Sequence, residues 1–224
     1  MKRIAAAILI ALMMGTALNS SAAAPDGQLD QILNNMQKAA AGIKTIYAKM
    51  DQAKRDAAIG GTERYSGEIF FKHAGKNSDK VRINYDVPKG QTIWIVGDQI
   101  ILYQKATGTA YMSSRRAQAS KNSEYAFVAT PYTSVPDLKR QYNIVHLGDD
   151  GGMAKLELTP KAKSALQKLT LWVDQGSWLP TKYQVAESNN SVTTFTLSNL
   201  KTNGVISDKV FNADFPSGTK KVNR

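Results

Sequence analysis

The sequence predicts a mainly β protein (α+β), a single domain in which one N-terminal helix accompanies a curled antiparallel sheet. Two patterns support this fold class. From residue 45 onward, short segments alternate apolar and polar residues and are separated by turn residues such as glycine and asparagine. Before residue 45, apolar residues recur at steps of three and four. Alternation with a period of two is typical of half-buried strands, and the longer step is typical of an amphipathic helix.

The first residues have the layout of a secretory signal peptide. Lys2 and Arg3 precede an apolar run, and small residues follow it at Ser21 and Ala23. The apolar run is too short for a stable membrane span, although an uncleaved N-terminal anchor is the alternative. We expect cleavage after Ala23, so that residues 1–23 are a leader and residues 24–224 form one domain in the periplasm.

The composition limits the classes of function. The chain has no cysteine, whereas a lipid-anchored precursor needs one directly after its cleavage site, so we do not expect the protein itself to be a lipoprotein. Disulfides and thiolate metal sites are excluded for the same reason. The formal net charge of +11 would favour nucleic-acid binding in a cytoplasmic protein. Because export argues against that partner, we expect no nucleic acid and interpret the basic residues as a solvated surface or a contact for anionic lipid headgroups.

The segment after the leader predicts a helix over Leu29–Ile43. Asp26 is placed to cap its N-terminus, and Gly42 weakens its last turn. Its apolar residues fall on one face, which must be buried against the sheet. These residues are Leu29, Ile32, Leu33, Met36, Ala40 and Ile43.

The first half of the sheet is predicted from five apolar segments separated by turns. The third segment alternates apolar and polar residues, which indicates one buried face. The fourth and fifth are apolar on both faces, which indicates central, covered strands. The segments are a strand from Thr45, then Ser66–His73, Val81–Tyr85, Thr92–Val96 and Ile100–Tyr103.

A long polar segment, Ser113–Lys139, interrupts the strand pattern. We expect it to be a mobile flap in which Asn122–Thr130 forms a short helix or turn, because long loops without regular structure are usually functional. The strand pattern then resumes and continues to the C-terminus. The predicted strands are Tyr142–Leu147, Lys155–Thr159, Lys168–Val173, Lys182–Ala186, Val192–Leu200 and a short one near Lys220–Val222.

The sequence offers little catalytic chemistry. His73 and His146, the two histidines, lie on predicted strands without a metal ligand at suitable spacing, and we interpret both as structural. Asp149 and Asp150 precede two glycines and indicate a hairpin tip, not an acid/base pair. We therefore expect no enzyme activity, no metal and no cofactor. A concave apolar sheet face under a helix is instead typical of a ligand pocket, but the same pattern fits a filled core equally well.

Several short segments recur in an order and spacing similar to one known family. They are Gly67–Lys72, Val81–Pro88, Gln91–Asp98, Leu156–Lys161, Leu169–Asp174 and Phe211–Gly218. In this order the sequence resembles the LolA-type outer-membrane lipoprotein carriers over nearly the whole chain after the leader. The resemblance implies a single half-open antiparallel β-barrel with helices as a lid over an apolar cavity. It also implies a monomer that takes acylated lipoproteins from an inner-membrane ABC transporter and passes them to an outer-membrane acceptor lipoprotein.

The resemblance assigns roles to particular residues. The helix Leu29–Ile43 would be the main lid, and Tyr125–Thr130 a second one. The face choice for Ile93 and Ile95 stays open because Trp94 is equally apolar. The expected cavity residues are Leu33, Met36, Ile69, Phe71, Ile83, Tyr85, Ile93, Ile95, Tyr103, Phe127, Leu171, Val173, Phe195 and Leu197.

One position departs from the family pattern. Enterobacterial members carry an arginine after the strand that corresponds to Gly67–Lys72, and it closes the lid. His73 aligns there, and Arg82 or Arg64 could substitute. Two other functions remain open: a carrier or sensor of a glycolipid or polyisoprenoid on the same fold, and an interaction protein whose barrel is filled by its own side chains.

Overall fold

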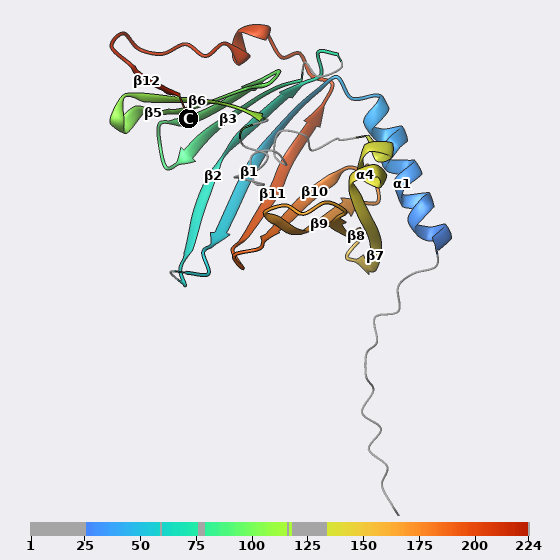
Figure 1. Ribbon diagram of the computed structural model, residues 1–224. Helices are drawn as coiled ribbons and strands as arrows, with labels where there is room; N and C mark the ends of the chain where they lie inside the picture. The colour runs from blue at the N-terminus through green and yellow to red at the C-terminus, as the bar shows by residue number, and fades with distance from the viewer. Residues whose placement is uncertain (1–25, 59, 76–78, 116, 118–133, 224) are drawn as a thin grey trace, which may run out of the picture.

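The computed structural model describes residues 26–58, 60–75, 79–115, 117 and 134–223. These residues form one strongly curled sheet of twelve strands with two helices on one side (Figure 1). The predicted fold class, a mainly β chain with an open antiparallel sheet and an N-terminal helix, is confirmed.

The strands follow the turns that the sequence indicates. In chain order, the first half contains β1 (Thr45–Arg55), β2 (Thr62–Lys72), β3 (Lys80–Val87), β4 (Gln91–Val96), β5 (Gln99–Gln104), a 3-10 turn η1 (Lys105–Thr107) and β6 (Thr109–Ser114). The second half contains β7 (Tyr142–Asp150), β8 (Met153–Pro160), β9 (Leu166–Asp174), β10 (Pro180–Glu187), β11 (Val192–Thr202), a 3-10 turn η2 (Asp208–Phe211) and β12 (Lys220–Asn223).

The two halves join at the middle of the sheet. The strand order is β12-β6-β5-β4-β3-β2-β1-β11-β10-β9-β8-β7, so β1 lies between β2 and β11. The pairs are antiparallel with one exception, because β12 returns along the sheet and pairs in parallel with β6. Strands β12 and β7 are therefore the two edge strands of the sheet.

The two helices both pack beside the β7 end of the sheet (Figure 1). Helix α1 (Asp26–Ala41) is described from Asp26 onward and ends two residues earlier than the predicted range Leu29–Ile43. Helix α4 (Val135–Gln141) corrects the expectation of an irregular flap over Ser113–Lys139, since β6 also extends to Ser114. Ser134 caps α4 by accepting a hydrogen bond from the backbone N–H of Asp137. The expected helix Asn122–Thr130 lies outside the described residues.

The sheet has two faces with different coverings. The main core lies on the face that carries α1 and α4, which we call the inner face. A smaller apolar cluster lies on the other face, the outer face, around Trp94 and Ile101. Strand β4 shows the alternation directly, because Ile93 and Ile95 belong to the inner core and Trp94 to the outer cluster. The sequence left open which residues of β4 lie on the inner face, and the structure places Ile93 and Ile95 there.

The expectation that Tyr103 faces the cavity is wrong. Its neighbour Leu102 packs against the inner core, so alternation along β5 sends Tyr103 to the outer face. There the centroid of its ring lies 5.6 Å from the centroid of the Phe215 ring. The Phe215 centroid in turn lies 5.8 Å from that of the Trp94 ring. A C-terminal segment, residues 203–219, thus covers this part of the outer face before β12 begins (Figure 1). None of the helices in the described part of the chain is long and apolar enough to cross a membrane.

Candidate lipid-binding site

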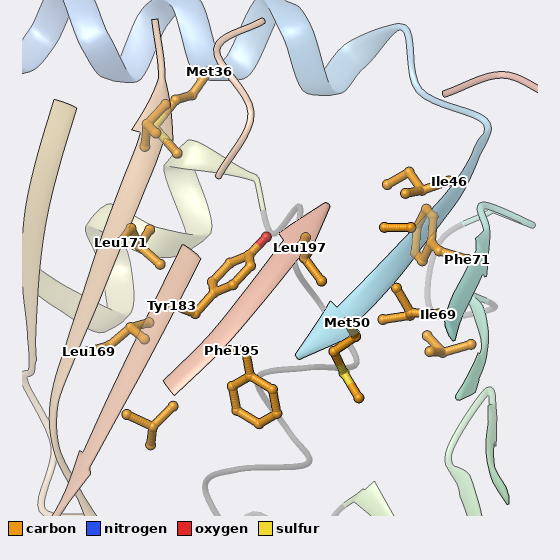
Figure 2. Packing of buried hydrophobic residues seen from close by; sticks show 14 of the residues in the cluster. Met36, Ile46, Met50, Ile69, Phe71, Leu169, Leu171, Tyr183, Phe195 and Leu197 are labelled. Atoms are coloured by element: carbon orange, nitrogen blue, oxygen red, sulfur yellow. The ribbon is translucent and has the colours of Figure 1, made fainter. Parts of the chain in front are cut away.

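The inner face under α1 and α4 brings together most of the residues that we expected to line a cavity. Every one of these side chains is buried. Figure 2 shows several of them converging from β2, β9 and β11, together with side chains of β1 and β10 and with Met36 of α1 above them. The expected residues in this cluster are Leu33, Met36, Ile69, Phe71, Ile83, Tyr85, Ile93, Ile95, Leu171, Val173, Phe195 and Leu197. Phe127 lies outside the described residues.

Strand register explains why these residues share one surface. Ile69 of β2 lies directly opposite Ile83 of β3, and Ile83 lies opposite Ile93 of β4. Across the centre of the sheet, Met50 of β1 lies opposite Leu197 of β11. Directly paired residues point to the same side of a sheet, so these rows continue across the seam between its two halves. The inner face is therefore a largely apolar surface that spans both halves of the sheet.

The two helices are joined to each other as well as to the sheet. The backbone N–H of Val135 donates to Oε1 of Gln37 at 2.9 Å, and Nζ of Lys139 lies 2.8 Å from Oδ1 of Asp30. Val135 also reaches the inner core with its side chain, as does Leu138. Sequence reasoning missed these contacts, because each polar pair is about a hundred residues apart in the chain and neither forms a local motif.

The side chain of His73 has partners away from both helices. Its Nδ1 lies 2.7 Å from Oδ1 of Asp79, and its backbone N–H donates to the carbonyl of Lys44. The ring is about half exposed at the end of β2. Among the described residues, no hydrogen bond or ion pair connects it to α1 or α4.

Arg82 points to the outer face. Its Nη1 donates to the carbonyl of Val210 at 2.9 Å, its Nε donates to Oδ1 of Asn84, and its guanidinium lies over the Trp94 ring. Burial under the C-terminal segment lowers the pKa of Arg82. The structure therefore gives this arginine a role in holding the C-terminal segment, and α1 and α4 are held by Gln37, Asp30 and Lys139 instead.

A few polar groups interrupt the apolar inner face. The Tyr85 hydroxyl donates to Oε1 of Gln52 at 3.2 Å, and both residues are buried. His146 is buried on β7 and contacts Asp149 through Nε2. Within the described residues, no group of three or more His, Asp or Glu could hold a metal ion. The arrangement offers an apolar surface. Each methylene group of a ligand that this surface removes from water contributes roughly 0.8 kcal/mol to the free energy of binding.

Comparisons with known proteins agree with this geometry. The family model described as outer membrane lipoprotein carrier protein LolA matches residues 41–214. Among solved structures, an uncharacterized conserved protein from Thermus thermophilus is similar, with a TM-score of 0.55, 12% identity, and coverage of 88% of this chain and 99% of that one. A domain from Vibrio parahaemolyticus described as an outer membrane lipoprotein-sorting protein has a TM-score of 0.52, 17% identity, and coverage of 81% and 95% respectively.

At these identities, the solved structures show the fold alone. No curated protein matches the sequence. The family match does not depend on the structural likeness, and it covers well over half of the chain, from the end of α1 to the C-terminal segment. Members of this family are periplasmic carriers and not enzymes. The chain belongs to the LolA family of outer membrane lipoprotein carriers.

Proposed function

We propose that this protein is a periplasmic carrier that binds the acyl chains of lipoproteins between the inner face and the lid formed by α1 and α4. It would receive acylated lipoproteins from an inner-membrane lipoprotein-releasing ABC transporter and deliver them to an outer-membrane acceptor lipoprotein. The leader of residues 1–23 would direct export, and residues 24–224 would act as a monomeric shuttle.

One observation carries this proposal: an apolar surface that spans both halves of the sheet is covered by a lid whose helices pack on it with apolar side chains. The described hydrogen bonds and ion pairs between α1 and α4 are those of Gln37 with Val135 and of Asp30 with Lys139. Lys161, just after β8, also donates hydrogen bonds to the carbonyls of Lys139 and Gln141 in α4. Leu33 and Met36 are among the side chains that pack the lid on the inner face through apolar contacts. Acyl chains can replace the apolar contacts of the lid, because apolar burial is non-directional and does not require a particular partner.

The cavity residues remain part of the proposal. Those on the inner face, from Ile69 on β2 to Leu197 on β11, would contact acyl chains once α1 moves outward. Phe127 stays a proposed contact, and Tyr103 is no longer included because it lies on the outer face.

The test is native mass spectrometry of the mature protein after co-expression in the periplasm with a tagged, triacylated lipoprotein. A one-to-one complex with the acylated lipoprotein is expected. The matched control is the same lipoprotein with its lipid-bearing cysteine replaced by alanine, which should give no complex. Recovery of the folded protein with a free glycolipid or isoprenoid, and without the lipoprotein, would reject this function in favour of another lipid cargo. Recovery without any lipid would support a filled barrel.

A further inference from the structure

His146 is a buried polar side chain in an otherwise apolar part of the inner face. It lies on the edge strand β7, directly opposite Leu156 of β8, which is a member of the inner core. Directly paired residues share a face, so the imidazole points to the inner side of the sheet. Its side chain is only 1% exposed.

His146 lies on the strand that both helices of the lid contact. Ile144 and Tyr142 precede it on the same face of β7 and pack against the inner core. Burial raises the pKa of the Tyr142 hydroxyl at the start of this strand. Both α1 and α4 contact β7. A ligand that enters between the lid and the sheet would therefore pass along this strand.

Asp149 fixes the orientation and the tautomer of the imidazole. Nε2 of His146 lies 2.8 Å from Oδ1 of Asp149. The pairing of β7 with β8 shifts register between these two residues, and Gly148 has a φ of +105° that permits the irregular backbone. Because a carboxylate accepts and cannot donate, Nε2 carries the proton in the neutral ring. Nδ1 is then a bare acceptor.

This acceptor is unsatisfied. Nδ1 is buried, and among the described residues it has no hydrogen-bond partner. Buried polar atoms in native proteins are nearly always paired, so an unpaired acceptor on the inner face indicates a position at which a ligand could supply the donor. The imidazole is also held in place by Asp149, which makes its free nitrogen a fixed, directional group on a surface that is otherwise non-directional.

We propose that Nδ1 of His146 accepts a hydrogen bond from a donor group next to the acyl chains of the cargo. This inference rests on the proposed lipid-carrier function and adds a source of selectivity to it. Two cargo groups supply such a donor: the amide N–H of an N-acylated lipoprotein terminus and the hydroxyl of a lipid headgroup. A lipid without any N–H or O–H group leaves the acceptor unpaired and loses affinity relative to the other two.

Ligand affinity tests the selectivity. The mature wild-type protein and three variants are titrated with a triacylated lipopeptide, phosphatidylglycerol and phosphatidylcholine, which supply an amide donor, hydroxyl donors and no donor respectively. His146→Phe removes the acceptor and should weaken binding of a donor ligand by roughly threefold to tenfold, with phosphatidylcholine unaffected. His146→Gln places its amide near the former Nε2 and should resemble the Phe variant. His146→Asn places its amide near the former Nδ1 and should retain part of the preference.

Nitrogen-15 NMR of the wild-type imidazole gives a readout that does not depend on the variants folding. The free protein should show the tautomer protonated at Nε2, and the Nδ1 resonance should move upfield with the lipopeptide or phosphatidylglycerol, but not with phosphatidylcholine. Which of the two donor ligands moves it identifies the source of the donor. An unchanged Nδ1 resonance with all three bound ligands would overturn this inference alone. Failure of the wild type to bind any of the three would overturn the carrier function as well.

Discussion

Lys139 of α4 and Asp30 of α1 form an ion pair, with 2.8 Å between Nζ and Oδ1, although 109 residues separate them in the chain. The two side chains are 52% and 62% exposed. At such exposure the attraction is screened by water and salt and is worth at most about 1 kcal/mol. The pair therefore favours one arrangement of the two helices without locking it, as the proposed outward movement of α1 would require.

The first prediction concerns this ion pair. Lys139→Glu should place two carboxylates together and open the lid more often, and amide hydrogen exchange of α1 should accelerate several-fold. The free energy of unfolding should change by no more than about 1 kcal/mol. The double variant Asp30→Lys with Lys139→Glu restores opposite charges and should restore slow exchange. Equal exchange rates of α1 in all three proteins would show that the pair does not orient the lid.

The second prediction concerns the inner face. Leu197→Asp should abolish or strongly reduce the binding of acyl chains, because a carboxylate on this surface must be buried by the ligand or remain protonated. Leu197 is buried on the inner face, and its neighbour Thr196 is exposed on the opposite face of the same strand. Thr196→Asp is therefore the matched control and should bind lipid normally. Binding is followed by displacement of a fluorescent fatty acid, after circular dichroism has shown that both variants are folded.

An undiminished affinity of folded Leu197→Asp would remove β11 from the binding surface. Loss of affinity in both variants would point to a general effect of added negative charge on this basic protein, and not to a contact with the acyl chains.

Much of the fold could be predicted from the sequence because the alternation of apolar and polar residues in a half-buried strand indicates which of its faces is buried. Val81, Ile83 and Tyr85 alternate with polar residues, and all three lie on the inner face as that pattern indicates. The rule cannot decide β4 and β5, where both faces are apolar. There the decisive contact is Phe215, which lies more than a hundred residues later in the chain and buries Trp94 and Tyr103 from the outer side.

The lid was predictable only in part. Helix α1 is long enough to show its apolar stripe, whereas the seven residues of α4 cover barely two turns and give no clear period. Ser134, with Pro136 at the second helical position, is a start signal that could have located α4. The unpaired Nδ1 of His146 could not have been found, because Asp149 reaches Nε2 of the same ring only through an irregularity in the strand.

The third prediction concerns the packing of α1 on the sheet. Leu33 is 1% exposed in the inner core, so Leu33→Ala should lower the free energy of unfolding by about 2–5 kcal/mol. Gln31→Ala, an exposed position on the same helix, should change it by less than about 0.5 kcal/mol. Urea denaturation of the lipid-free protein measures both. A small effect of Leu33→Ala would mean that α1 detaches before the sheet unfolds, and proteolysis of the N-terminal segment under native conditions would then reveal the detached state.

The fourth prediction concerns the pH dependence of the C-terminal segment. Asp208 accepts hydrogen bonds from Lys80 at 2.8 Å and Lys72 at 3.2 Å. These two partners lower the pKa of Asp208 below its ordinary value of 3.8. A carboxyl group with a lowered pKa in the folded state contributes stability that is fully present above 3.8 and is lost as the pH falls through the lower, folded-state pKa. We therefore expect residues 203–219 to stay attached near pH 5 and to loosen at more acidic pH.

The measurement is amide hydrogen exchange of residues 203–219 as a function of pH, corrected for the intrinsic rates, with Asp208→Asn as the control. In the wild type, protection should decrease below about pH 4, while β1 and β2 stay protected. The Asn variant, which has no charge to lose, should show lower protection near pH 5 and no comparable step below it. A step of equal size in both proteins would assign the acid response to another carboxyl group, with Asp214, near Arg82, the next to replace.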